Sequence, residues 1–366
     1  DLKGRWRTLF SKELPGIHSL VAGPAQGMGH LGVAAMGYTR WGLYPHCHPS
    51  LIFEQEASKP NPWQIAPDLS KALRSVVRPR SALWCDLRGD GYPELLIASH
   101  GGPIRLFENR KGHLEEATAQ WGLDRWRGLW TSLVAADLDG NGHLDLLAGN
   151  LGANTRWQAS REKPLRWYFG DPLKNGRYVV IETVYHADGR QGPALPRDKM
   201  VSWMPSMRSE LTTHESYKKM SIEALLEPDP EGWSVMEVDT LESMILYNNG
   251  EGKFDGKPLP LPVQQAPISG LQAADFNGDG QVDLIVGQIG MISSVGNFSF
   301  QLGGLLLLRG ESDGTFRKMS PDSCGLPFDA GFQSIGLGDF NGDHRMDIVA
   351  TQAGGQTRLF FNQHPQ

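Results

Sequence analysis

The sequence has 366 residues, of which 40% are hydrophobic and 21% are charged, a balance typical of a folded globular chain. Its 44 glycines and 24 prolines favour many short strands and turns over long helices. The formal net charge is −6 and no basic stripe is present, so nucleic-acid binding is disfavoured. Apolar runs such as Leu305 to Leu308 are far too short to cross a bilayer, so no transmembrane segment is expected.

The N-terminal stretch contains an apolar pattern, Trp6-Arg-Thr-Leu-Phe, that is similar to a later stretch, Thr315-Phe-Arg-Lys-Met. The C-terminal pattern Thr357-Arg-Leu-Phe-Phe-Asn is that of a third strand with no fourth strand after it. We therefore predict that the N-terminal stretch supplies this fourth strand, which leaves no open sheet edge. Because the chain starts at Asp1 rather than at Met, we expect a processed chain or a fragment.

From residue 17 onward, short apolar strands and short loops recur in units. Residues 187–228 interrupt them, because Arg197 to Leu226 is rich in helix-forming residues, and we predict a helical insert there. The units occupy residues 17–66, 80–118, 128–160, 165–186, 268–320 and 331–366. This gives six units, or seven if residues 187–262 contain another. No long linker divides residues 1–366, which predicts a single domain.

The most informative loop runs Asp275-Phe-Asn-Gly-Asp-Gly-Gln-Val-Asp283, between two apolar strands. Side-chain oxygens stand at positions 1, 3, 5 and 9, and Gly280 at position 6 permits a sharp turn. Calcium prefers six or more oxygen ligands, which alternate residues of a tight loop can supply. A strand follows the loop, and the glutamate of an EF-hand is absent, so this is predicted to be a calcium loop within a β-hairpin.

The same pattern occurs twice more, at Asp137-Leu-Asp-Gly-Asn-Gly-His-Leu-Asp145 and at Asp339-Phe-Asn-Gly-Asp-His-Arg-Met-Asp347. In the last copy His344 replaces the glycine of position 6, so that turn is expected to be more strained. Position 7 would contribute its backbone carbonyl. We predict about three Ca²⁺ sites with a structural role, formed by Asp137, Asp139, Asn141, His143 and Asp145; by Asp275, Asn277, Asp279, Gln281 and Asp283; and by Asp339, Asn341, Asp343, Arg345 and Asp347.

A fourth copy, Asp86-Leu-Arg-Gly-Asp-Gly-Tyr-Pro-Glu94, is degenerate, because Arg88 stands where a ligand should be. We predict that the Arg88 guanidinium replaces the metal by pairing with Asp86 and Asp90. The alternative is a weaker metal site that uses Glu94. Another degenerate loop, Asp171-Pro-Leu-Lys-Asn-Gly, occurs in the unit at residues 165–186.

Repetition of strand, acidic loop and strand at this spacing is typical of propeller blades or solenoid turns. The motifs resemble the FG-GAP/VCBS repeats of integrin-α-like β-propellers, and more specifically the bacterial relatives of cartilage acidic protein that are associated with ASPIC/UnbV modules. The resemblance covers most of the chain from about Ser81 onward, without a clear ASPIC/UnbV segment. It implies an all-β propeller of six, alternatively seven, blades with the calcium loops on one face, a helical insert, and a last blade closed by both termini.

In that geometry the segments that follow the second strands lie on the opposite face, which is the expected partner surface. Trp126, Trp130 and Trp157 cluster near the segments that connect blades and are candidates for binding a peptide or a sugar ring. The alternative is that they pack between blades. No catalytic motif stands out in the sequence.

The main functional hypothesis is a calcium-stabilised interaction module that is secreted, periplasmic or on the cell surface. It would bind a protein or a glycan, or would be a subunit of a larger complex. The alternative is a carbohydrate-active enzyme, a lyase or hydrolase, on a propeller scaffold, since the fold alone does not decide function. A third reading is an accessory part of an electron-transfer or membrane complex, held by the helical insert.

Overall fold

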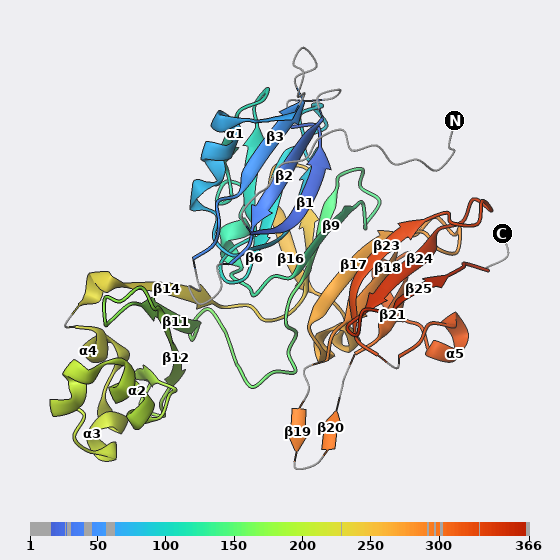
Figure 1. The fold of residues 1–366 in the computed structure, drawn as a ribbon. Coiled ribbons are helices and arrows are strands. Elements are labelled where there is room, and N and C mark those ends of the chain that lie inside the picture. The colour runs from blue at the N-terminus through green and yellow to red at the C-terminus, as the bar shows by residue number, and fades with distance from the viewer. Residues whose placement is uncertain are drawn as a thin grey trace.

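The fold is described from a computed structural model of the chain (Figure 1). Most of the regular secondary structure in the described part consists of antiparallel β-sheets. The described residues are 16–25, 27, 31–39, 46–55, 63–227, 229–290, 293–295, 298–300, 303–328 and 330–363. The N-terminal stretch around Trp6, for which a strand is predicted, lies outside these residues.

Two sheets near the N-terminus each consist of four strands that follow one another along the chain. Glycine and proline punctuate the turns between these strands, as expected for short antiparallel hairpins. The strands of the first sheet are β1 (Ile17–Gly23), β2 (Gly32–Gly37), β3 (Leu51–Gln55) and β4 (Trp63–Ile65), and those of the second are β5 (Pro79–Cys85), β6 (Glu94–Ser99), β7 (Arg105–Asn109) and β8 (Leu114–Glu116).

Two C-terminal sheets repeat this order, although the last one has three strands among the described residues. The fourth sheet contains β17 (Ile268–Ala274), β18 (Asp283–Gln288), β21 (Leu305–Gly310) and β22 (Phe316–Lys318), and the fifth contains β23 (Phe332–Gly338), β24 (Asp347–Gln352) and β25 (Thr357–Phe360). A separate two-stranded ribbon is formed by β19 (Ser293–Val295) and β20 (Phe298–Phe300).

The third sheet is discontinuous in sequence, with the strand order β16-β15-β10-β9. Its first hairpin surrounds the Asp137 loop, and its second hairpin comes from residues far along the chain. Its strands are β9 (Ser132–Ala136), β10 (Asp145–Gly149), β15 (Met244–Asn248) and β16 (Phe254–Pro258). Residues 150–243 are therefore inserted between the second and third strands of this sheet.

The inserted residues form a sheet of their own with the order β13-β12-β11-β14, and helices cover one side of it (Figure 1). Helices are present within residues 187–228, where the sequence indicated them. The strands are β11 (Leu165–Gly170), β12 (Val179–Tyr185), β13 (Gln191–Pro193) and β14 (Trp233–Val238), and the helices are α2 (Arg197–Trp203), α3 (His214–Lys219), α4 (Ile222–Leu226) and the 3-10 turns η3 (Pro205–Ser209) and η4 (Pro230–Gly232).

The prediction that residues 165–186 begin a further blade like the others is wrong in its topology. They do form a hairpin, β11 with β12, but β14 pairs with the other edge of β11. The first strand of this hairpin is thus internal to its sheet, whereas the first strand of every other repeated sheet is at an edge. The remaining short elements are α1 (Pro67–Ala72), α5 (Pro321–Cys324), η1 (Leu73–Ser75), η2 (Leu123–Arg125) and η5 (Leu261–Gln265).

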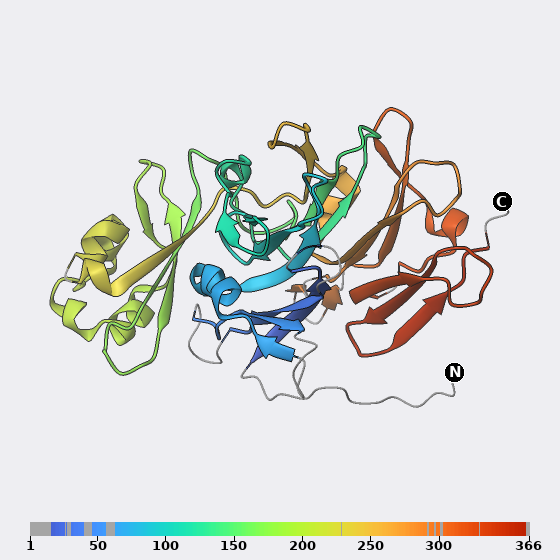
Figure 2. The same cartoon turned by 90° about the horizontal axis from the view of Figure 1, so that it is seen from above.

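The five repeated sheets stand side by side through their first strands, because β1 packs on β5, β5 on β9, β9 on β17, and β17 on β23. A hydrophobic core lies between each sheet and the next. Figure 2 shows this series from above, with the inserted sheet apart from it. Among the described strands, β23 and β1 at the two ends of the series share no comparable packing. A closed ring and its number of blades therefore stay predictions, as does the single domain over residues 1–366.

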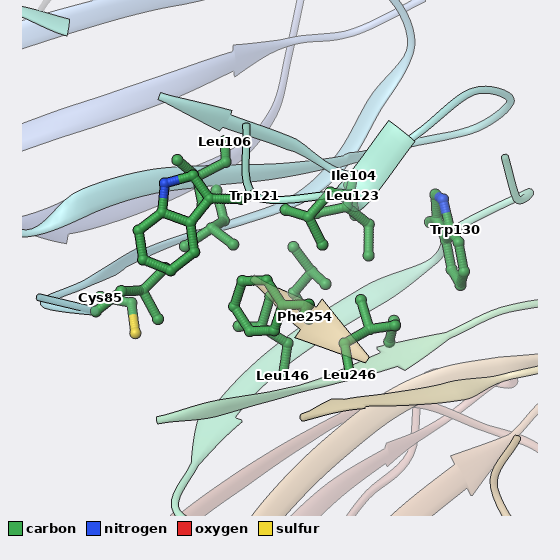
Figure 3. Packing of buried hydrophobic residues seen from close by; sticks show 14 of the residues in the cluster. Cys85, Ile104, Leu106, Trp121, Leu123, Trp130, Leu146, Leu246 and Phe254 are labelled. Carbon is green, nitrogen blue, oxygen red and sulfur yellow. The ribbon is translucent and has the colours of Figure 1, made fainter. Parts of the chain in front are cut away.

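The core between the second and third sheets shows how these sheets are held together (Figure 3). Leu106 and Leu146 face one another across it, and the Phe254 ring of the fourth strand β16 fills the space between them. Trp130 lies in the same cluster with 0% of its surface exposed. Of the two readings of Trp130, the structure supports packing between sheets and excludes a place on the partner face, because the buried ring fills this core.

Candidate cation-binding loops

Each acidic loop is preorganised by backbone N–H groups that point at the carboxylate of position 1. In the first loop Asp137 accepts from Gly140 N at 2.9 Å and from Gly142 N at 3.0 Å. In the second loop Asp275 accepts from Gly278 N at 2.7 Å and from Gly280 N at 2.8 Å. These glycines have positive φ angles, which a side chain would make costly.

The aspartate at position 9 is the buried anchor of each loop. Asp145 is 0% exposed, and its two oxygens accept from Leu138 N at 3.0 Å and Asn248 N at 2.8 Å. The first donor belongs to the loop itself and the second to the end of the third strand of the sheet. The carboxylate therefore joins the hairpin to β15. Asp283 and Asp347 are buried in the same way. Asp283 accepts from Phe276 N and Gly310 N, and Asp347 accepts from Phe340 N and Asn362 N.

Burial raises the pKa of Asp145 to about 6, against the two backbone hydrogen bonds, which lower it. The negative charges of Asp139 and Asp137 raise this pKa as well. Burial likewise raises the pKa of Asp283, with contributions from Asp279 and Asp275. The charged forms of Asp145 and Asp283 are thus disfavoured by the protein alone, and a nearby cation would reverse this preference.

The first loop has the donor set that a hard cation requires. Asp137, Asp139 and Asp145 each offer an oxygen, and these oxygens lie within 4.8 Å of one another. The Asn141 side chain, at position 5, accepts from His143 N at 2.7 Å and donates to Asn248 O at 3.2 Å. Carboxylate and amide oxygens suit Ca²⁺ better than they suit softer metals. The residues present therefore fit a calcium ion at this loop.

The second loop carries an arginine neighbour that the sequence analysis did not consider. Arg309, on β21, pairs with Asp279 at 2.6 Å, and the amide of Asn277 donates to the same carboxylate at 3.0 Å. The pKa of Asp279 is lowered, first by the N–H of Gln281 and next by Arg309. Arg309 therefore supplies positive charge at position 5 of this loop.

The third loop shows the strain that its sequence predicts. His344 has φ of 65°, in the left-handed region that glycine occupies in the other loops. A residue with a side chain rarely adopts this backbone conformation, because it costs free energy. The N–H of His344 still donates to Asp339, at 2.9 Å. Arg345 at position 7 pairs through its side chain with Asp343, at 3.2 Å. The scaffold of the turn is thus retained at a cost in backbone strain.

In the degenerate loop Arg88 makes one of its two predicted ion pairs. It pairs with Asp90 at 3.1 Å, and its other partners are Glu94 at 3.0 Å and Glu108 at 3.8 Å. No ion pair joins it to Asp86 within the described ranges. The Asp86 carboxylate accepts from the backbone N–H groups of Asp90 and Gly91 instead, as position 1 does in the other loops. Arg88 also donates to the backbone oxygen of Asn109, at 3.0 Å.

Glu94 takes the place of the buried anchor in this loop and is 0% exposed. Burial raises its pKa to about 7, while the Leu87 N–H and the Arg88 charge lower it. Arg88 therefore stands where the other loops would hold their cation.

The same position-1 turn recurs in the inserted sheet, where Asp171 accepts from Asn175 N at 3.1 Å and Gly176 N at 2.6 Å.

The other two candidate tryptophans are half-buried and already engaged. Trp157 donates to Glu182 at 2.7 Å, stands edge-on to Trp167, and has the Arg156 guanidinium over its ring at 5.0 Å. Trp126 packs against the core between the second and third sheets, under the guanidinium of Arg125. A partner role for Trp126 and Trp157 stays a prediction.

The asparagine that ends the third strand is a site residue that sequence reasoning missed. Asn248 and Asn362 donate their backbone N–H to the buried anchor of their own sheet. Asn362 also donates its side chain to Phe276 O of the preceding sheet, at 2.7 Å. Asn109 likewise reaches Ala25 O, at 3.0 Å. The signal was in the sequence, because an aromatic strand ends in asparagine at all three positions.

Comparison with known proteins supports the repeat. Residues 86–148, which include the Arg88 loop and the Asp137 loop, match the FG-GAP-like repeat. This confirms the FG-GAP part of the resemblance for that segment, while the relation to cartilage acidic protein stays a prediction. No curated protein matches the sequence.

Two solved structures are similar over most of the chain at very low identity. The Vibrio cholerae biofilm matrix protein Bap1 has 11% identity and a TM-score of 0.32, over 95% of this chain and 77% of that one. Chaetomium thermophilum Sqt1, bound to the N-terminus of the ribosomal protein L10, has 9% identity and a TM-score of 0.27, over 94% and 87%. At these scores neither similarity carries a conclusion about fold or function.

Proposed function

We propose that this protein is a calcium-stabilised β-propeller of FG-GAP repeats that acts outside the cytoplasm as an interaction module. The observation that carries the proposal is the convergence of Asp137, Asp139 and Asp145 within 4.8 Å in a loop whose backbone already orients the carboxylates. Free calcium outside cells is about millimolar, a level that suits loops of modest affinity. Such a module binds a protein or a glycan, or serves as a subunit of a larger assembly.

The ion would be held by the side chains at positions 1, 3, 5 and 9 and by the backbone carbonyl of position 7. Bound calcium supplies positive charge that offsets the mutual repulsion of the carboxylates. The chain's own residues then do the structural work. Asp145 ties the hairpin to β15, and Asp283 and Asp347 do the same for their sheets. In the degenerate loop the Arg88 guanidinium supplies the charge without an ion.

Isothermal titration calorimetry and equilibrium dialysis test the calcium proposal. We expect about three Ca²⁺ ions per chain, a lower melting temperature in EDTA, and recovery on adding calcium in excess. The variant Asp137→Asn should lose one ion, while Asp86→Asn should leave the number of bound ions unchanged. Absence of bound calcium, together with an unchanged melting temperature in EDTA, would refute the proposal.

The N-terminal stretch closes the last blade in this proposal. In three sheets the fourth strand places an apolar side chain, Leu114, Phe254 or Phe316, against a core. Among the described residues the last sheet ends with β25, and Leu359 in this strand and Phe361 just after it are 44% and 49% exposed. A cavity of about 640 Å³ beside them is lined by apolar groups of β21, β24 and β25 and by Cys324. The candidate for the missing strand is the N-terminal pattern in which Trp6 corresponds to Phe316, and these residues lie outside the described part of the chain.

Thiol cross-linking tests this closure in the full chain. In the variant Trp6→Cys, a short bismaleimide should join residue 6 to the native Cys324, which lines the cavity and is partly exposed. The same variant with Cys324→Ser should not cross-link. A product of twice the chain mass would show instead that the strand comes from a second copy, and no product at all would contradict the closure.

The proposal favours an interaction module over the carbohydrate-active enzyme. The clustered ionisable groups of the loops serve as hairpin anchors, each bonded to backbone N–H groups. No helix in the described part of the chain combines the length and the apolar character needed to cross a bilayer. Turnover of a polysaccharide that is abolished by a single substitution would favour the enzyme instead.

A further inference from the structure

Basic side chains gather where the first two sheets meet, at the end of the sheets opposite to the acidic loops. His18 lies near the start of β1, and Arg80 lies near the start of β5, which packs beside β1. The Nη1 atom of Arg80 is 3.3 Å from Nε2 of His18. His100, directly after β6, belongs to the segment predicted to lie on the partner face. We refer to His18, Arg80 and His100 as the basic seam.

The guanidinium of Arg80 gives the seam a positive local potential. Burial lowers the pKa of His18, and the charge of Arg80 lowers it further. Burial also lowers the pKa of His100 to about 4, with the charges of Arg80 and Arg78 adding to the effect. No ion pair involves Arg80 in the described residues, whereas Arg88, Arg309 and Arg345 each pair with an aspartate. An anion placed here would therefore meet an unneutralised guanidinium.

Arg78 is a buried residue that supports the basic seam. It is buried, with 8% of its surface exposed, and its Nε donates to the backbone oxygen of His100 at 2.7 Å. Its guanidinium also stands over the ring of Phe169, 5.8 Å from the centroid. The backbone at Arg78 has φ of 51°, a conformation that costs free energy in a residue with a side chain. This strained, buried arginine holds the His100 segment in place and adds to the positive potential.

Aromatic rings extend the seam on both sides. The Tyr38 ring lies nearly parallel to His18, with centroids 6.1 Å apart, and is 46% exposed. On the other side His100 stacks on Trp167 at 6.5 Å, and Trp157 stands edge-on to Trp167 at 5.4 Å. Of the tyrosine and tryptophan rings Tyr38 is the exposed one, and His18 lies between it and the guanidinium of Arg80. A cationic guanidinium near an exposed aromatic ring matches a sugar that carries an acidic group, since the ring contacts the apolar face of the sugar and arginine binds the oxyanion.

We propose that the basic seam binds the acidic groups of a polysaccharide, either uronate carboxylates or sulfate esters. This inference rests on the proposed function as an interaction module and names the chemistry of its partner. The Arg80 guanidinium donates to the oxyanion, and Tyr38 contacts the adjacent sugar. A nucleic acid is another polyanion that a guanidinium can bind, and its binding is therefore one of the outcomes of the test.

The test measures binding of three fluorescent oligosaccharides: a polymannuronate fragment, a heparin fragment and a neutral dextran. We expect binding of one or both acidic probes and no binding of dextran. Arg80→Gln should weaken binding by about tenfold, the value of one charge-assisted hydrogen bond, whereas Arg80→Lys should retain part of it. The control is Arg208→Gln, which removes one exposed positive charge from η3 and should change affinity by less than about twofold.

The outcomes separate this inference from the calcium proposal. Every titration is run in calcium and in EDTA, with melting curves to show that each variant is folded. If no calcium binds to the loops but Arg80→Gln still weakens binding of the acidic probes, the basic seam is supported and the calcium proposal is refuted. Equal affinity of Arg80→Gln and the unaltered protein, in either buffer, overturns the seam. Equal loss in Arg80→Gln and Arg208→Gln overturns it too, as does stronger binding of single-stranded DNA than of either acidic probe.

Discussion

Substituting the buried anchor Asp145 by asparagine separates its role in the fold from its role as a metal ligand. In EDTA two effects oppose one another. The amide can accept one of the two backbone N–H groups, from Leu138 or from Asn248, and leaves the other unsatisfied, which costs about 1–3 kcal/mol. Against this, a pKa raised from 3.8 to about 6 means that the buried charge costs about 3 kcal/mol at pH 7.5, and the amide removes that cost.

We therefore expect Asp145→Asn to be at least as stable as the unaltered protein in EDTA, and less stable in calcium. Calcium at 100 times its dissociation constant would stabilise the unaltered protein by about 2.7 kcal/mol per site, and the variant would lose most of this at one loop. The measurement is urea unfolding at pH 7.5 in each buffer. Asp255→Asn is the matched control, because that carboxylate is 75% exposed and its effect should be the same in both buffers.

The pH dependence of the free energy of unfolding is a second test of the role of Asp145. The folded protein binds this proton more tightly than the unfolded chain does, so in EDTA the contribution of Asp145 to stability falls as the pH rises from about 4 to about 6. Asp145→Asn should lack this fall. If the difference between the variant and the unaltered protein is the same in calcium and in EDTA, the loop binds no ion and the reasoning is refuted.

Three further substitutions test other parts of the structure. Arg88→Met should destabilise the protein by about 3 kcal/mol, in calcium and in EDTA alike. The loss should be larger at pH 8 than at pH 6, because the pKa of Glu94 is about 7 and its ionised form loses the neighbouring positive charge. A loss of stability that differs between calcium and EDTA would contradict replacement of the metal by Arg88. His344→Gly should stabilise by about 1 kcal/mol in urea unfolding, since φ of 65° strains a non-glycine residue whose side chain is 93% exposed. Trp130→Ala should lower stability by about 3–5 kcal/mol, and a smaller loss than about 1 kcal/mol would contradict its place in the core.

The loops could be predicted from the sequence because their chemistry is local. A carboxylate at position 1 and glycines at positions 4 and 6 are enough to form the turn, and the backbone bonds to Asp137 and Asp275 follow from residues within five positions. The same holds for the strain at His344, which depends on one position of a repeated turn. Local pattern also placed the helices between residues 187 and 228.

The third sheet could not be predicted in this way, because its two hairpins are separated by residues 150–243. The pairing of β10 with β15 depends on which apolar faces fit together, and neither strand carries a local signal for the other. For the same reason the sequence left open whether Trp130 packs between sheets or faces a partner, and it did not predict that Arg88 pairs with Glu94 rather than with Asp86. The sequence by itself determined the hairpin turns, where neighbouring residues fix the geometry. Tertiary structure decided which strands pair and which side chains are buried, since those depend on contacts between distant residues.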